Sequence, residues 1–234
     1  MQADDVRKEL QILADPEKAK ILQRFFKTGP GEYGEGDVFL GVIVPKSRFL
    51  AKTFSLLPLD EVKALLYSGV HEERLVALLI LVQKYNSASV REKEDIFRFY
   101  LDNLKQVNNW DLVDLTAPNI LGVHLVAKDR GLLYRLANSD SVWERRVAIV
   151  STYHFIRNDE FGDTLKIAEM LLHEDHDLIH KAAGWMLREV GKRDLAAEKA
   201  FLDEHYRVMP RTMLRYAVER FPESKKRYYM KIAR

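Results

Sequence analysis

Similar apolar segments with helical periodicity recur along the chain at nearly equal spacing. Each carries an alanine on its apolar face close behind a basic residue, and these alanines are Ala77, Ala148, Ala183 and Ala217. Their separations are 71, 35 and 34 residues, and the first gap is about two periods with its midpoint near Leu112. A period of this size with two helices per unit is typical of helical solenoids. The sequence therefore predicts an all-α fold, an α-solenoid of HEAT-like helical repeats that is curved and presents a concave binding face.

Much of the remaining chain also has apolar residues at three- and four-residue intervals, which indicates amphipathic helices. Two helix starts have plausible caps, at Asp15 followed by Pro16 and at Ser141 with Glu144 three residues later. The expected helices are Val6–Leu13, Ala19–Phe26, Val62–Leu66, Leu75–Tyr85, Ile96–Leu104 and Leu165–Leu172.

One long stretch departs from this pattern. The glycine-rich segment Gly29–Gly36 is followed by a β-rich run, Val38–Val44. A lone strand is not stable, so we expect residues 29–44 to form an ordered, irregular loop between helices. The whole chain, residues 1–234, is then predicted to be a single helical-repeat domain with this loop and a basic C-terminal segment at 205–234.

Composition excludes several classes of protein. The chain of 234 residues has no cysteine, which excludes disulfides, thiolate metal sites and a cysteine nucleophile. Its longest apolar run, Leu75–Val82, is too short to cross a bilayer, and its N-terminus lacks the pattern of a signal peptide. We expect a monomeric, cytoplasmic protein without contact to membranes.

The net charge of +2 hides an asymmetry. Residues 205–234 contain nine basic and two acidic residues, a net charge of +7, which leaves −5 for residues 1–204. A basic end on an acidic chain is typical of a protein that binds a polyanion, and a solvated C-terminal helix is the alternative.

Two motif-like patterns favour ordinary structural roles. The spacing of Gly29, Gly31 and Gly34 matches a dinucleotide fingerprint, but that motif follows a strand and opens a helix, whereas here it follows a helical pattern. His176 and His180 share a helical face without an evident third ligand. The sequence thus predicts neither a cofactor nor a metal ion.

All three tryptophans fall near acidic or basic residues in successive repeats. In the first of these segments Trp110 and Asp114 are four residues apart, on one helical face, and in the last Trp185 and Arg188 are three apart. Trp143 opens the helix between them. Two interpretations remain open: tryptophans of the core with salt-bridging neighbours, or a cleft with indole surfaces, an acid and phosphate-binding guanidinium groups.

The phrases NWDLVD, VWERRVAI and KAAGWMLREVGK resemble the AlkD family of bacterial DNA alkylation-repair glycosylases, and the similarity extends to about Phe221. The resemblance implies a stack of HEAT-like repeats and hydrolysis of the N-glycosidic bond of N3- and N7-alkylated purines in double-stranded DNA. Matched by motif, Trp110, Asp114 and Trp185 correspond to the lesion site of the family. Arg146 matches its phosphate-contacting arginine, and Trp143 is assigned to the core.

Further expectations follow from this resemblance. Arg188 is a candidate for a second backbone contact, and basic residues near the C-terminus, among them Arg211 and Arg215, are expected to hold phosphates. Asp114 would stabilise an oxocarbenium-like deoxyribose and orient water, while the tryptophans would pack on the sugar. The family grips the DNA backbone without a base pocket, and no pocket motif is evident in this sequence.

Other functions remain possible on the same scaffold, since a fold does not fix a function. The principal alternative to a monofunctional glycosylase is a HEAT-repeat protein that binds DNA structures without cutting them, or a protein scaffold. A metal-dependent hydrolase is a more distant alternative.

Overall fold

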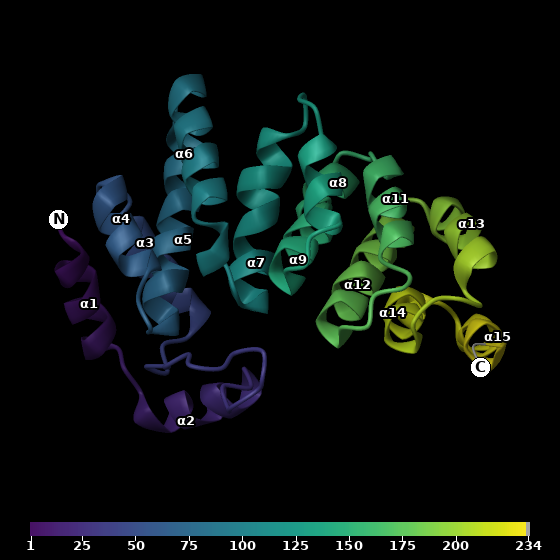
Figure 1. Cartoon of the computed structure of the whole chain (residues 1–234), viewed down its shortest axis with the longest axis horizontal. Coiled ribbons are helices and arrows are strands. Elements are labelled where there is room, and N and C mark those ends of the chain that lie inside the picture. The colour runs from purple at the N-terminus through teal and green to yellow at the C-terminus, as the bar shows by residue number, and fades with distance from the viewer. Residues whose placement is uncertain (233–234) are drawn as a thin grey trace. The chain divides into compact units, whose positions relative to one another are not determined.

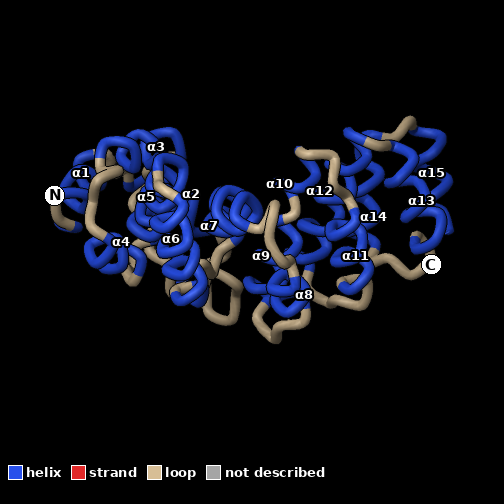
Figure 2. Tube along the Cα trace, turned by 90° about the horizontal axis from the view of Figure 1, so that it is seen from above, coloured by secondary structure: helices blue, strands red, loops and turns tan. Residues whose placement is uncertain are grey.

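Helices make up most of the part of the chain that the structure describes. The computed structural model describes residues 1–232; Arg234 of the predicted basic segment lies outside them. Within this range the only β-type pairing is an isolated parallel bridge between Val38 and Val70, and helices alternate with short loops (Figures 1 and 2). The predicted all-α class is confirmed, and the helical succession is consistent with an α-solenoid of repeats. None of the helices in residues 1–232 combines the length and the apolar character needed to cross a membrane.

Contacts group the chain into two compact units. Unit 1 comprises Met1–Thr116, and unit 2 begins at Ala117. The organisation of residues 1–234 as a single domain stays a prediction.

In unit 1, helix α5 is central and packs against α1, α3, α4 and α6. Nearly every residue in its first three turns is buried, including charged ones, so these charges must find partners inside the unit. The elements are α1 (Ala3–Ile12), α2 (Pro16–Phe25), α3 (Val44–Thr53), α4 (Leu59–Leu66), α5 (His71–Ser87), α6 (Val90–Asp102), the 3₁₀ turn η1 (Leu104–Gln106) and α7 (Trp110–Ala117).

In unit 2, helix α12 has the central place and contacts α9, α11, α13 and α14. Gly184 lies where α12 meets α14: a Cβ atom there would come within 2.3 Å of the Met213 carbonyl oxygen. The elements are the π-helical turn η2 (Pro118–Gly122), α8 (Gly131–Ala137), α9 (Val142–Ser151), α10 (Tyr153–Arg157), α11 (Gly162–Met170), α12 (Asp177–Arg193), α13 (Leu195–His205), α14 (Arg211–Ala217), the 3₁₀ turn η3 (Val218–Arg220) and α15 (Glu223–Ile232).

The structure confirms the predicted caps at Asp15 and Ser141 and the helical positions of the repeat alanines. Asp15 caps α2 by accepting the backbone N–H of Lys18, with proline at the first helical position, and Ser141 caps α9 by accepting that of Glu144. The four repeat alanines lie on α5, α9, α12 and α14, and each is 0% exposed, as is Leu112 on α7. Helix α3 is not among the predicted helices, and neither are α8, α10 and α13.

Residues 29–43 form the predicted ordered loop. The loop closes against α5 through the bridge, where Val38 donates its N–H to the Gly69 carbonyl and accepts that of His71. Gly41 has a φ of +84°, and a Cβ atom there would lie 2.1 Å from the carbonyl oxygen of Asp15. The loop therefore fits closely against the start of α2.

We expect Gly41→Ala to lower the free energy of unfolding by about 3 kcal/mol, because it combines a left-handed backbone with an overlap that only backbone movement relieves. Gly69→Ala is the control, since a Cβ atom there meets no atom within 4 Å. Urea denaturation of both variants measures the difference. Equal midpoints for the two would contradict the close fit of the loop.

Candidate functional site

Trp110 and Asp114 are brought together in unit 1, at the start of α7. Trp110 is the first residue of the helix and Asp114 lies one turn later, so both side chains share a face. The side chain of Asn109 supports this start by accepting the Trp110 backbone N–H at 2.8 Å. Both Trp110 and Asp114 are half-buried, and both line one cavity.

This cavity, which we call the α7 cavity, lies entirely within unit 1 and has a volume of about 430 Å³. Its walls come from α2, the loop, the starts of α3 and α5, and α7, and they are mostly apolar. Its volume falls in the range of sites that bind small molecules. The aromatic and charged residues that line the cavity are Phe25, Phe26, Phe39, His71, Glu72, Trp110, Asp111 and Asp114.

Aromatic rings form one wall of the α7 cavity. The indole of Trp110 is stacked on Phe26, with centroids 4.9 Å apart and planes at 10°. Phe25 meets the same indole edge-on, at 5.9 Å and 81°, and Phe26 in turn packs on Phe39 at 4.8 Å. Phe26 and Phe39 are buried with Ala19 in a small cluster, whereas Phe25 is 62% exposed. Trp110 is thus packed on one side and open to the cavity on another.

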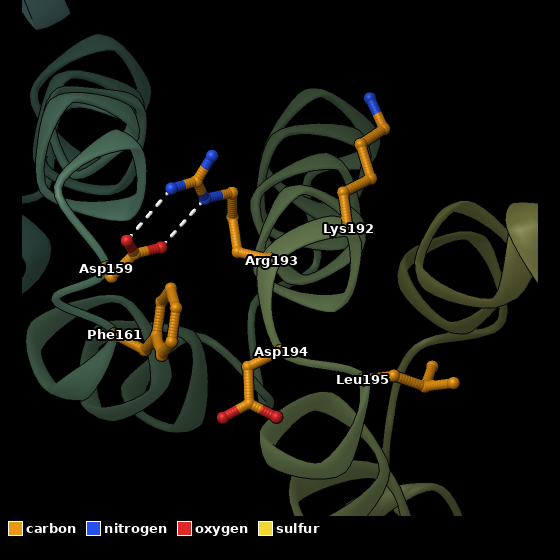
Figure 3. Close-up of a pocket in the computed structure, with 6 residues that line it drawn as sticks. All are labelled: Asp159, Phe161, Lys192, Arg193, Asp194 and Leu195. Carbon is orange, nitrogen blue, oxygen red and sulfur yellow. Dashed lines mark hydrogen bonds and ion pairs between the residues drawn. The ribbon is translucent and has the colours of Figure 1, made fainter.

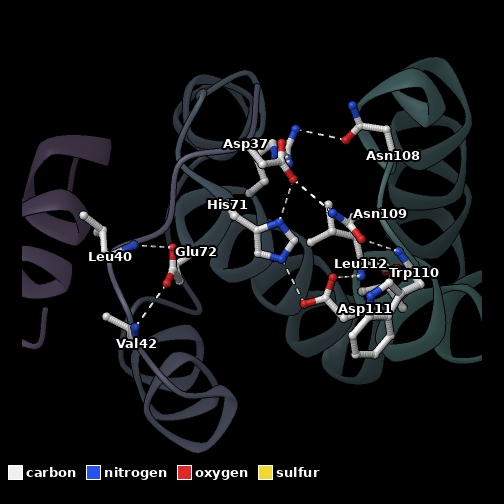
Figure 4. A network of polar contacts seen from close by, with 12 residues as sticks. Asp37, Leu40, Val42, His71, Glu72, Asn108, Asn109, Trp110, Asp111 and Leu112 are labelled. Carbon is white, nitrogen blue, oxygen red and sulfur yellow. Dashed lines mark hydrogen bonds and ion pairs between the residues drawn. The ribbon is translucent and has the colours of Figure 1, made fainter. Parts of the chain in front are cut away.

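Behind this wall lies a buried network of charges (Figure 4). The His71 ring lies between two carboxylates, with Nδ1 3.1 Å from Asp37 Oδ2 and Nε2 2.9 Å from Asp111 Oδ2. Arg74 donates to Asp37 at 2.6 Å and to Asn108 at 2.9 Å. The network joins the loop, α5 and the first turn of α7, so it fixes the register of the helix that carries Asp114.

Protonation of His71 is strongly favoured inside this network. Burial alone would lower its pKa, but the charge of Asp111 and the hydrogen bonds to Asp111 and Asp37 raise the pKa to about 9. Burial likewise raises the pKa of Asp37, and the hydrogen bond from His71 and the charge of Arg74 outweigh it, so the pKa of Asp37 is lowered. His71 is therefore an imidazolium at neutral pH.

An acid on α5, Glu72, holds the loop by its backbone. The buried carboxylate of Glu72 accepts the N–H groups of Leu40, Gly41 and Val42, at 2.9, 2.8 and 3.1 Å. Figure 4 shows this carboxylate between the backbones of Leu40 and Val42. Three charge-assisted bonds explain how a segment without regular structure becomes part of a cavity wall.

Trp185 lies in unit 2, on α12. Its indole N–H donates to Glu189 at 3.0 Å, and its ring lies 5.8 Å from that of Tyr153 on α10. Trp143, which we assigned to the core, is half-buried at the start of α9. A single site that combines Trp185 with Trp110 and Asp114 stays a prediction.

The four predicted DNA-contacting arginines differ in their surroundings. Arg146 is only 5% exposed and donates to the carbonyl of Leu178 at 2.5 Å, so its predicted phosphate contact requires the guanidinium to leave this position. Arg188 forms ion pairs with Glu219 and Glu189. Arg211 and Arg215 are exposed and one turn apart on α14; Arg211 also donates to the carbonyl of Met230.

Unit 2 also has an open hollow of about 630 Å³ between the turn before α11 and the end of α12 (Figure 3). Its charged groups already have partners within the protein. Arg193 binds Asp159 through two hydrogen bonds, at 2.7 and 2.9 Å, Lys192 pairs with Glu189, and Asp194 caps α13. We assign this hollow no chemistry.

The glycine and histidine motifs have structural surroundings. The segment from Gly29 to Gly34 follows helix α2, and the next helix begins only at Val44, so the strand–turn–helix context of a dinucleotide site is not present here. His176 caps α12, and His180 donates to the carbonyl of Glu174. Among residues 1–232, no group of three histidine, aspartate or glutamate side chains is placed to hold a metal ion.

Sequence reasoning missed several residues of the α7 cavity, namely Phe25, Phe26, Phe39 and His71. A signal was present in the paired phenylalanines Phe25 and Phe26 at the end of α2. Periodicity alone does not show that these segments meet at α7.

The charge network predicts a pH dependence of stability. The pKa of His71 is raised from 6.5 to about 9, so its stabilisation is fully present below pH 6.5 and is lost as the pH rises through 9. The loss is on the order of 3 kcal/mol. We expect NMR titration to find His71 protonated well above neutral pH, in contrast to His154, whose pKa is lowered by burial and by Arg157.

The variant Asp111→Asn tests this pH dependence, because it removes the acid whose charge raises the pKa of His71 most. It should lower that pKa and flatten the loss of stability between pH 6.5 and 9. Glu198 in unit 2, whose pKa burial raises to about 8, adds a separate loss at lower pH in both proteins, so the difference between them isolates His71. A wild-type His71 that titrates near 6.5 would contradict the proposed charge state.

Comparison with known proteins agrees with the resemblance in the motifs. A similar solved structure is a predicted DNA alkylation repair enzyme from Enterococcus faecalis, with 19% sequence identity and a TM-score of 0.68 over 90% of this chain and 97% of that chain, a likeness that concerns the fold. No curated protein matches the sequence. The model of the family described as DNA alkylation repair enzyme matches residues 6–221. Because that match covers most of this chain, the chain belongs to the DNA alkylation repair enzyme family.

Proposed function

We propose that the protein is a monofunctional DNA glycosylase that hydrolyses the N-glycosidic bond of cationic N3- and N7-alkylated purines in double-stranded DNA. The observation that carries this proposal is the pairing of Trp110 and Asp114 on one face of α7, at an aromatic cavity, in a chain of the DNA alkylation repair family. Family membership supports a role in alkylation repair; the side chains at α7 support the reaction.

The reaction needs little acid catalysis. An alkylated purine carries a positive charge, so the electron pair of the C1′–N bond moves onto the base and a neutral alkylpurine leaves. The deoxyribose becomes an oxocarbenium-like cation in the transition state. A carboxylate placed at that cation stabilises the charge that develops during the reaction, which is the kind of interaction that accelerates it.

In this proposal Asp114 is that carboxylate, and it also orients the water whose oxygen bonds to C1′. The proton lost by the water passes to Asp114 or to solvent. Trp110 packs against the sugar and adds cation stabilisation through its ring face. Trp185 keeps its predicted role at the sugar as part of the proposal.

DNA phosphates are proposed to bind the basic end of the chain. Arg211 and Arg215 on α14 are exposed and project from successive turns, a spacing that suits two neighbouring phosphates. We also propose that Arg146 and Arg188 contact the phosphate backbone of the DNA, as the sequence predicts. The proposed reaction uses no cofactor or metal ion. The protein is also proposed to act as a monomer.

Asp114→Asn tests the catalytic role, because the amide keeps the size of the side chain and removes its charge. We expect release of 7-methylguanine from methylated duplex to fall about a hundredfold, roughly 3 kcal/mol of transition-state stabilisation. Asp102→Asn, at the exposed end of α6, is the control and should match wild type. Chelator should leave wild-type release unchanged.

Two results would count against the proposal. Equal release by wild type and Asp114→Asn would exclude the carboxylate from the chemistry. Salt-dependent DNA binding by wild type without any release would favour a non-catalytic DNA binder instead.

The double variant Arg211→Ala/Arg215→Ala tests the phosphate contacts. The slope of log K against log salt for duplex binding should decrease by roughly 2, because each phosphate contact contributes about 0.9. Lys8→Ala, an exposed charge on α1, should leave the slope unchanged. An unaltered slope in the double variant would remove α14 from the DNA-binding surface.

A further inference from the structure

The indole of Trp185 is held at two places. Its N–H donates to Glu189 Oε1 at 3.0 Å, and its ring lies 5.8 Å from that of Tyr153, with the two planes inclined at 37°. Trp185 and Glu189 are four residues apart on α12 and share one face of the helix, whereas Tyr153 comes from α10. Trp185 is only half-buried, so packing does not enclose its ring on every side. The hydrogen bond to Glu189 therefore selects one orientation of the ring among the rotamers open to it.

The acceptor is a buried acid whose own position is fixed. Glu189 is 8% exposed, and a carboxylate so far from water costs free energy unless cations meet it. Two cations on the same helix do so: Lys192 donates to Oε1 at 2.6 Å, and Nη2 of Arg188 lies 3.7 Å from this oxygen. The indole N–H and both cations thus meet the same oxygen, and the cations hold the carboxylate beside the indole.

The fold itself does not call for an acid at this position. Residues 185 and 189 are already one turn apart within α12, so a hydrogen bond between their side chains joins no distant segments. An apolar residue of similar size would fill the same space without burying a charge, an exchange that is often neutral or stabilising. What Glu189 supplies, and an apolar residue does not, is a fixed acceptor for the indole N–H.

We propose that Glu189 is a positioning residue of the glycosylase reaction, whose carboxylate sets the orientation in which the ring of Trp185 meets the deoxyribose. This inference rests on the proposed function, in which Trp185 packs on the sugar, and it names the residue that holds the ring there. A ring face stabilises a cation that lies over it, so a rotated indole loses this contact in the transition state. A ring that is oriented before DNA binds does not have to be ordered during the reaction.

Two uncharged variants isolate the hydrogen bond. Glu189→Gln keeps an oxygen that accepts the indole N–H, whereas Glu189→Leu has a similar size and no acceptor. NMR of the free protein follows the indole N–H of Trp185, which is identified by its disappearance in Trp185→Phe. We expect this N–H to exchange with solvent about tenfold faster in Glu189→Leu than in Glu189→Gln, because it has lost its partner. Glu189→Met, whose flexible side chain adapts to the same space, repeats the comparison.

Kinetics of base release from methylated duplex test whether this orientation matters to the reaction. We expect kcat of Glu189→Leu to be about tenfold below that of Glu189→Gln, with a much smaller difference in KM, because the contact with the cation forms in the transition state. Trp185→Phe keeps an aromatic face and has no N–H. In that background the two variants at position 189 should have equal kcat, since Glu189 acts through the indole. A purely structural role of Glu189 predicts the same ratio in both backgrounds.

The outcomes separate this inference from the function on which it rests. No base release by wild type would overturn the proposed function and the positioning role with it. Base release by wild type, together with equal exchange of the Trp185 N–H in Glu189→Gln and Glu189→Leu, would leave the glycosylase standing and overturn the positioning role. An unchanged ratio of kcat in the Trp185→Phe background would do the same.

Discussion

The buried imidazolium of His71 is the interaction on which the geometry of unit 1 depends. It neutralises Asp37 from the loop and Asp111 from α7 at once, at 3.1 and 2.9 Å, from the first residue of α5. An unpaired buried ion costs several kcal/mol. His71 supplies the opposite charge to both carboxylates, and Arg74 adds a second cation beside Asp37. The distance from His71 to its partners therefore sets the place of α7, and with it the place of Trp110 and Asp114.

The loop at residues 29–43 is held as a wall of the cavity by contacts of its backbone as well as by the side chains of Asp37 and Phe39. Glu72 accepts three of its N–H groups, the bridge to Val70 fixes its middle, and Gly41 permits its close approach to α2. Each of these contacts satisfies groups that would otherwise be buried without a partner. An irregular segment can be as well defined as a helix when its hydrogen bonds are supplied from outside.

The helical fold was predictable from the sequence because its signal is local and repeated. The spacing from Ala77 to Ala217 and the caps at Asp15 and Ser141 report on single helices and their neighbours in the chain. The pairing of Trp110 and Asp114 was predictable for the same reason, since four residues make about one turn. The cavity beside them was not predictable. It is formed by α2, the loop, α5 and α7, which meet through contacts between distant residues, such as that of Asn109 with Asp37, 72 residues apart. Periodicity does not encode such contacts.

The parallel stack of Trp110 on Phe26 has a consequence for how relatives of this chain are classified. Phe26, the ring that supports the tryptophan of the NWDLVD segment, lies at the end of α2, more than eighty positions earlier in the chain. A homologue could retain the motif and yet lack the first helices or the glycine-rich segment. Its tryptophan would then have no aromatic ring to stack on, although the motif itself was unchanged. Before the activity is assigned to such sequences, the phenylalanine pair at the end of α2 and the residues equivalent to Asp37 and His71 should be checked along with the motif.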